Sequence, residues 1–555
     1  MADDDELFII THTVEDNNPT NLVDPALQLP HHILHYIFSY LSFHDLLHVR
    51  LVNKNWYLNT PSHFNFHFNE SLFRKRDPTS YSLNDFWDSI RSSIDSSKEK
   101  LINVEKRVLH VEFINDEYIR DIMKLLEENN FHEVYLKMFY DHLPYIFQSK
   151  CLTILHLTNC VIDDQDVLCD EVTIPSLLEL KLEGVTLSEE ILSKFISKFP
   201  NIRELSFVKR WGISFIVLTN LPCLEKLYVN ISDSSSFTNI QVIAPRLQVF
   251  HFILRNRDLE IEDVVVTMDI RACKMLREFH LNCSKFPNGL DPENFCSDFP
   301  HLETLLLGPC QTEKPIKTSG SSLRKWILSI PKVYECTRKS VVSSPNLSCF
   351  KYKGTTFQPY LAPSKLLETN YNIVLVPKIN KIMKRAWFLK LRSHLQNFSN
   401  HNTTLEIRIK TSVCHPSSKP SGRAPTQPLH YIKHIMVDMN KLEYQEEHLM
   451  RYIIDNLLWM SHPNTLTLSI PTSFSPTALG VMKKLYGRRN RNCCSGTHDK
   501  CWRHFLKYFE VKEEEEHPDA PSSLSAHPRK FKQDSDEKVD KLTKFIFIFF
   551  WKFNS

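Results

Sequence analysis

One pattern of hydrophobic positions recurs between residues 131 and 352: an apolar residue, two variable residues, a second apolar residue, one variable residue and a third apolar residue. Successive copies begin 21 to 29 residues apart, an interval typical of solenoid repeats. The last two apolar positions of each copy have the spacing that places side chains on one face of a β-strand. The copies begin at Phe131, Leu152, Leu177, Ile202, Leu224, Leu247, Leu276, Leu302, Leu323 and Leu347.

Proline punctuates this pattern. It stands two residues before many copies, where it ends a preceding helix and leads the chain into an extended strand. Helical segments fit between the strands, as at 187–196, where Ser188 can cap a helix whose Leu192 and Phe195 face inward. Each copy supplies a short parallel strand and a helix or turn, and stacked copies bury a shared core. The pattern therefore predicts an α/β solenoid within the period range of leucine-rich repeats, a curved horseshoe with parallel strands on its concave face.

The residues that alternate with the apolar positions of each strand point away from the core. We expect them to form the concave surface, where aromatic and amphipathic side chains suit protein recognition. For any single position the alternative is an ordinary solvated strand face, but the face as a whole is the candidate target-binding site. Its candidate residues are Tyr135, His156, Lys181, Lys226, Tyr228, His251 and His280.

Residues 29–60 predict a small helical module. Apolar residues from Ile33 to Leu41 follow helical spacing, and Ser42 and Asn53 can cap a second and a third helix. Three short helices cannot bury enough surface to be stable alone. Part of their apolar surface therefore requires a partner.

The same stretch resembles an F-box, because it matches the pattern LPxxILxxIxxxLxxxDLLxxxxVxKxW in order and spacing. The family usually has proline where Ser42 stands. The resemblance implies a three-helix F-box that docks on a Skp-type adaptor, which links to a cullin scaffold and a RING ubiquitin ligase. The alternative is that these residues only form the core of a small cap. The residues that the resemblance assigns to adaptor binding are Leu29, Pro30, Ile33, Leu34, Ile37, Leu41, Leu46, Leu47, Val52 and Trp56.

An F-box followed by irregular, glycine-poor and proline-punctuated repeats resembles plant-type F-box/leucine-rich-repeat proteins over most of residues 29–353. This resemblance implies a substrate-recognition subunit of an SCF-type E3 ubiquitin ligase, a non-catalytic receptor that needs no cofactor. The alternative is a leucine-rich-repeat interaction scaffold without a ligase role.

Composition narrows the functions further. Lys and Arg number 67 and Asp and Glu 65, so the net charge of +2 gives no electrostatic footprint for nucleic acid or an anionic membrane. Only 10 of 555 residues are glycine, and none are spaced as in a nucleotide-binding loop. Cysteine and histidine are frequent, but no spacing pairs a nucleophile with a base and an orienting carboxylate. We therefore expect a protein that is not an enzyme.

The 14 cysteines show no regular disulfide framework, and most occupy apolar positions where a reduced thiol packs as a small hydrophobe. We therefore expect the protein to reside in a reducing compartment, the cytoplasm or the nucleus. A cluster with two histidines (Cys493, Cys494, His498, Cys501 and His504) has no second ligand pair, so buried thiols and histidines are favoured over a metal site.

The termini carry separate expectations. The first six residues are acidic, unlike a targeting signal, and no window of about 20 apolar residues could span a membrane. The short apolar run at 545–551 could be an anchor, a partner-binding strand or translated non-coding sequence, and the last two are favoured.

We divide the chain into an acidic disordered N-terminus (1–24), an F-box (25–62), initial repeats with a polar insertion at 74–100 (63–130), leucine-rich repeats (131–360), degenerate repeats or a C-terminal cap (361–510) and a disordered tail (511–555).

Overall fold

The structure is a computed structural model of the whole chain, and it divides into two compact units, Met1–Met138 and Phe139–Ser555. The residues that it describes are 29–30, 33–34, 37, 52, 56, 63–70, 82–97, 106–112, 119–142, 151–162, 174–208, 213–231, 237–254, 265–308, 310, 314, 316–318, 320–329, 341–342, 344–354, 370–375, 385–396, 402–408, 429–430, 432–439, 447–472, 475–487, 502–515 and 542–552.

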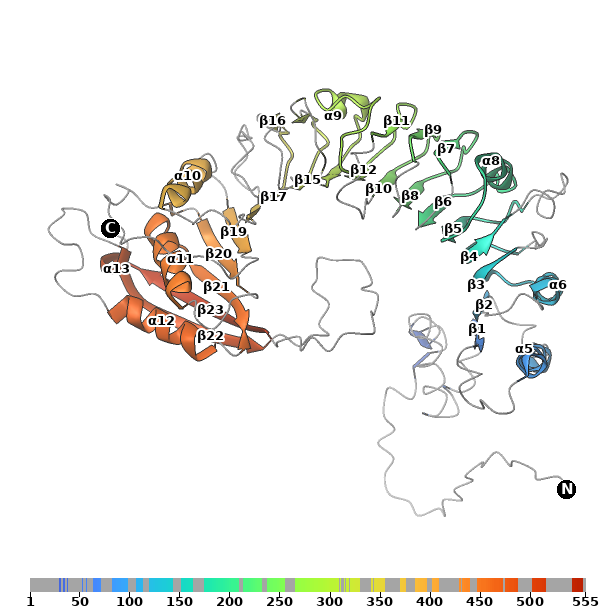
Figure 1. Cartoon of the computed structure of the whole chain (residues 1–555), viewed down its shortest axis with the longest axis horizontal. Coiled ribbons are helices and arrows are strands. Elements are labelled where there is room, and N and C mark those ends of the chain that lie inside the picture. Colours follow the sequence, from blue (N-terminus) through green and yellow to red (C-terminus); the bar gives the residue numbers. More distant parts are fainter. Residues whose placement is uncertain are drawn as a thin grey trace, which may run out of the picture. The chain divides into compact units, whose positions relative to one another are not determined.

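The first unit contains parallel strands joined by helices. Strand β1 (His63–Asn69) pairs with β2 (Lys106–Glu112), and β2 pairs with the first residues of β3 (Glu133–His142). Helix α5 (Leu83–Ser97) connects β1 to β2, and α6 (Ile119–Asn129) connects β2 to β3 (Figure 1). This strand–helix–strand order is the connection that parallel pairing requires.

Helix α5 occupies the described part of the polar stretch at 74–100. Its residues Phe86, Trp87, Ile90 and Ile94 expose 8% or less of their surface. Their spacing gives the helix one apolar face, although Asp, Ser and Arg on the other face make the segment polar on average. Mean polarity therefore concealed an amphipathic helix.

The second unit is a β-solenoid of parallel strands stacked in one sheet. Each strand pairs in parallel with the next in the series, and Figure 1 shows them side by side. In order they are β4 (Ile154–Val161), β5 (Glu179–Glu183), β6 (Glu204–Val208), β8 (Lys226–Ile231), β10 (Val249–Leu254), β12 (Glu278–Asn282), β13 (Thr304–Leu307), β15 (Lys325–Ser329), β17 (Cys349–Gly354), β18 (Asn370–Leu375), β19 (Asn402–Arg408), β20 (Ile432–Asp438) and β21 (Thr465–Pro471).

Short elements lie on the other side of the core (Figure 1). They are helix α8 (Glu189–Ser197), a second parallel sheet of β7 (Phe215–Leu218), β9 (Asn239–Val242) and β11 (Thr267–Asp269), helix α9 (Phe295–Asp298), and the pair β14 (Lys317–Thr318) and β16 (Val341–Val342). The predicted cap of α8 is confirmed, because the backbone N–H of Ile191 donates to Ser188 Oγ at 3.3 Å.

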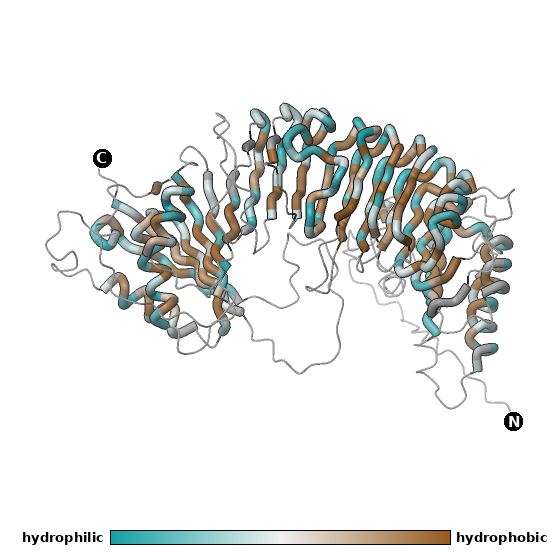
Figure 2. Tube along the Cα trace, turned by 45° about the horizontal axis from the view of Figure 1, so that its top comes forward, coloured by the Kyte–Doolittle hydropathy of each residue, from teal (hydrophilic) through white to brown (hydrophobic). Residues whose placement is uncertain are grey.

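The repeating apolar positions form the core. All thirty motif residues of the ten copies are buried, and none exposes more than 3% of its surface. Figure 2 shows the stacked strands as mostly hydrophobic, with many hydrophilic residues in the turns at their ends. The predicted solenoid of stacked parallel strands is therefore confirmed.

The parallel stacking continues beyond the regular repeats, with helices beside it. Residues 405, 435 and 466 lie in β19, β20 and β21, and residues 451–460 lie in α11 (Glu447–Met460). The other elements are α10 (Arg385–Leu395), α12 (Ser475–Gly487), α13 (Trp502–Phe505), β22 (Leu506–Glu515) and β23 (Leu542–Trp551).

The expectation of a disordered tail over 511–555 is wrong for its described residues, because 511–515 lie in β22 and 542–551 form β23. Strand β23 lies between β21 and β22 and pairs antiparallel with both. Phe545, Phe547, Phe549 and Trp551 alternate along it and are buried, and the indole N–H of Trp551 donates to the Pro463 carbonyl oxygen at 2.7 Å. The run is therefore a strand of this chain's own sheet.

Across the described residues, the helices are all too short or too polar to span a bilayer.

Candidate functional site

Outward-facing residues of the second unit align from strand to strand. Because neighbouring strands pair without a shift, one row joins His156, Lys181, Ser206, Tyr228, His251 and His280. A parallel row two residues earlier joins Ile154, Glu179, Glu204, Lys226, Val249 and Glu278. We call the outward-facing residues of β4 to β17 the ladder face. The face brings together six of the seven predicted target-binding residues; the seventh, Tyr135, belongs to the first unit.

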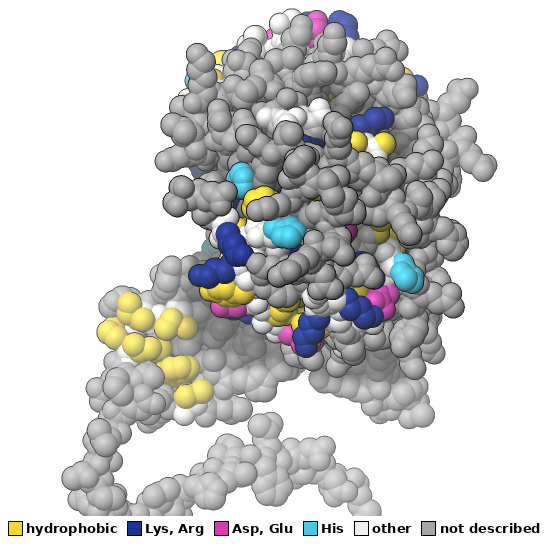
Figure 3. Space-filling model, turned by 90° about the vertical axis from the view of Figure 1, so that its left-hand side faces the viewer, with side chains coloured by type: hydrophobic (Ala, Val, Ile, Leu, Met, Phe, Trp, Pro, Cys, Tyr) yellow, Lys and Arg dark blue, Asp and Glu magenta, His cyan; other side chains and the backbone are white. Residues whose placement is uncertain are grey.

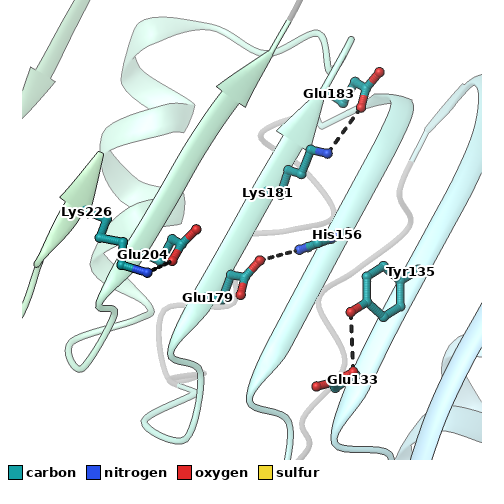
Figure 4. A network of polar contacts seen from close by, with 8 residues as sticks. All are labelled: Glu133, Tyr135, His156, Glu179, Lys181, Glu183, Glu204 and Lys226. Carbon is teal, nitrogen blue, oxygen red and sulfur yellow. Dashed lines mark hydrogen bonds and ion pairs between the residues drawn. The ribbon is translucent and has the colours of Figure 1, made fainter. Parts of the chain in front are cut away.

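Ion pairs connect the first strands of the ladder face (Figure 4). The imidazole Nε2 of His156 lies 2.7 Å from Glu179 Oε1, and Lys226 Nζ lies 2.9 Å from Glu204 Oε2. The hydrogen bond from His156 is the main cause that holds the pKa of Glu179 below its usual range. Lys181 lies 3.5 Å from Glu183 on its own strand. These pairs fix the side chains in position, although exposed pairs of this kind contribute little stability.

Aromatic rings continue the face across the next strands. The ring centroids of Tyr228 and His251 are 5.0 Å apart, and those of His251 and His280 are 5.2 Å apart, all edge-to-face. His251 Nε2 also lies 2.7 Å from Glu278 Oε1, which lowers the pKa of that carboxyl group. Burial is the main cause that raises the pKa of Tyr228. Half-buried rings with polar edges suit contact with a partner protein.

The first unit carries a similar row. The rings of His110 and Tyr135 stack with centroids 4.1 Å apart, and His67 lies edge-on to His110 at 5.7 Å. The hydroxyl of Tyr135 donates to Glu133 Oε2 at 3.3 Å (Figure 4). Sequence reasoning selected Tyr135 but missed His67 and His110. Both alternate with apolar residues along β1 and β2, so the rule that selected the other outward-facing residues identifies them when it is applied to these strands.

The predicted adaptor-binding residues fall into three groups. Pro30, Ile33, Ile37 and Val52 are exposed, Leu29 and Trp56 are partly exposed, and Leu34 is completely buried. The assignment of these residues to adaptor binding stays a prediction. Leu41, Leu46 and Leu47 lie outside the described residues.

The cysteine and histidine cluster remains untested as a metal site. Of its members only His504, in α13, is described, and the described residues contain no group of three potential metal ligands. On the side drawn in Figure 3, basic side chains lie beside acidic ones, as the near-neutral net charge leads one to expect.

Comparison with known proteins identifies one domain. Residues 26–64 match the F-box-like family. No curated protein matches the chain. The chain thus combines an F-box-like domain with a β-solenoid. An F-box-like domain indicates an F-box protein with a substrate-adaptor role and binding to a Skp-type adaptor.

Proposed function

We propose that this chain is the substrate-recognition subunit of an SCF-type E3 ubiquitin ligase. The F-box-like domain at 26–64 binds a Skp-type adaptor, and through it a cullin–RING ligase, while the ladder face binds the target protein. The observation that carries the proposal is the presence in one chain of this domain and a solenoid with an ordered, half-exposed polar and aromatic face.

The mechanism is positioning. A receptor that holds a target near a charged ubiquitin carrier raises the local concentration of the target's lysine side chains and so raises the rate of transfer. The receptor itself then needs no catalytic residue. A rigid face suits this role because little conformational freedom is lost when the target binds.

We propose further that the repeating units of the solenoid are leucine-rich repeats of the type found in plant F-box proteins. The repeat length and the burial of every motif position support this assignment. The proposal also places the complex in the cytoplasm or nucleus, because cysteines such as Cys160 and Cys273 are buried among apolar side chains as thiols.

Exposed apolar side chains support the assignment of residues in the F-box-like domain to adaptor binding. Ile33, Ile37 and Val52 expose 37%, 38% and 52% of their surface. Exposed apolar side chains are stabilised when they are buried in a groove of a partner protein. We assign the adaptor contact to these residues together with Leu29 and Pro30.

Capture by purified Skp-type adaptor tests the proposal. The intact chain should be retained, and Ile33→Asp with Ile37→Asp should reduce retention at least about tenfold, because a buried unpaired charge costs more than 1.4 kcal/mol. Leu29→Ala with Pro30→Ala should also weaken capture. The matched control is Ile243→Asp with Val265→Asp, which are 44% and 41% exposed in the solenoid and should leave capture unchanged.

Two results would count against the proposal. If the intact chain is not captured, the alternative of an interaction scaffold without a ligase role is favoured. If Ile33→Asp with Ile37→Asp is captured as well as the intact chain, the adaptor contact is assigned wrongly.

A further inference from the structure

The charge of the ladder face changes along the series of strands. Its first strands carry carboxylates at Glu179, Glu183 and Glu204, which pair with His156, Lys181 and Lys226 on the same face. The described outward positions of β13, β15 and β17 carry no carboxylate. They hold Thr304, Leu306, Lys325, Ile327, Ser329, Cys349, Lys351 and Lys353. This part of the face, which we call the lysine patch, is therefore cationic and partly apolar.

Two lysines of the patch are available to a partner. Lys325 is exposed and Lys351 is partly exposed, and neither forms an ion pair with a described residue. Glu278 of β12 interacts electrostatically with Lys325, but its hydrogen bond is with His251, and Glu303, just before β13, lies 3.9 Å from Arg277. An ammonium group that has no carboxylate in direct contact attracts an anion more strongly than one already in an ion pair.

The spacing of the patch fits an extended peptide. Ile327 follows Lys325 by two residues on β15, and Ile327 pairs with Lys351 of β17. Strands lie about 4.8 Å apart and alternate residues about 7 Å apart, so the two lysine Cα atoms are separated by roughly 8 Å. The side chains on one face of an extended peptide recur at nearly this distance. Leu306 and Ile327, paired on neighbouring strands, offer apolar contact beside the charges.

We propose that the lysine patch binds an acidic, extended segment of the partner protein, in which Asp or Glu side chains contact Lys325 and Lys351 and apolar side chains cover Leu306 and Ile327. This inference rests on the proposed function, since it names the class of target segment that the solenoid selects. Charge complementarity favours this occupant over a basic or neutral segment.

Selection from a phage-displayed library of random linear peptides on the immobilised full-length chain tests the inference. The intact chain should enrich peptides rich in Asp and Glu with interspersed apolar residues. Lys325→Glu with Lys351→Glu should weaken binding of the selected peptides roughly tenfold, because two attractive contacts become repulsive. The matched control is Lys390→Glu with Lys483→Glu, exposed lysines of α10 and α12, which make the same change in net charge and should bind as the intact chain does.

The possible results are distinct. No enrichment of acidic peptides, or equal binding by Lys325→Glu with Lys351→Glu, overturns the inference. Competition by oligothymidylate at the concentration of the selected peptide also overturns it, because any polyanion would then suffice. Adaptor capture is measured on the same variants and should be unchanged. An intact chain that is captured by the adaptor but selects no acidic peptides rejects the lysine patch alone. An intact chain that selects acidic peptides but is not captured rejects the ligase role alone.

Discussion

The packing of β23 makes a stability prediction that can be worked out from the structure. Phe547 is completely buried in the centre of this strand, opposite Leu466 of β21 on one side and Val511 of β22 on the other. Its ring also packs near Phe545 and Phe509, with centroids 6.3 Å and 6.2 Å away. Replacing a buried phenylalanine by alanine removes its transfer free energy and leaves a cavity. Phe547→Ala should therefore lower the free energy of unfolding by about 3–5 kcal/mol.

Urea unfolding of the full chain, followed by tryptophan fluorescence, measures this change. Trp551 lies on the same strand, and the buried Trp502 lies in α13, directly before β22, so the fluorescence signal reports on the affected region. The control is Ile546→Ala, a partly exposed neighbour on the other face of β23, which should cost about 1 kcal/mol. A loss below about 1 kcal/mol for Phe547→Ala would refute the placement of this strand in the core.

Two further stability predictions follow from buried side chains. Leu180 is completely buried at a motif position of β5. Leu180→Ala should therefore lower the free energy of unfolding by about 2–5 kcal/mol in the same urea assay, and an unchanged unfolding midpoint would contradict the repeat packing. Burial lowers the pKa of His462 from 6.5 to about 4, so the unfolded chain binds a proton that the folded chain does not between these pH values. The free energy of unfolding should fall by on the order of 3 kcal/mol as the pH falls through this window. His462→Phe, which keeps a ring against Trp551, should lose less stability on acidification, and an identical pH profile would contradict the assignment.

The regular repeats were predictable because each strand repeats the same three apolar positions, and the burial of a motif such as Leu180 and Leu182 needs only a neighbour of the same kind. Strand β23 was not predictable in this way, because its surroundings decide its structure. The apolar run of β23 becomes a central strand only when β21 and β22 flank it, and these pairings join residues far apart in the sequence.

The candidate sites also combine features that the sequence predicts with features that depend on packing. Strand alternation was sufficient to select Tyr228 and His251 as outward-facing residues, but the ring contact between them depends on the register of β8 and β10. Motif matching named Ile33 and Leu34 together, but it could not predict that Ile33 is exposed and Leu34 buried. Likewise, the lysine patch depends on which strands are neighbours and on which carboxylates are already paired.

The central claim is that one chain holds a target with its solenoid and recruits a ubiquitin ligase with its F-box-like domain. Its most direct test is to measure ubiquitin on the proteins bound by the intact chain and by a chain lacking residues 26–64, each expressed in the native cell. Both forms should bind the same proteins, and those proteins should carry added ubiquitin only with the intact chain. Equal ubiquitin on the bound proteins with and without residues 26–64 would contradict the account.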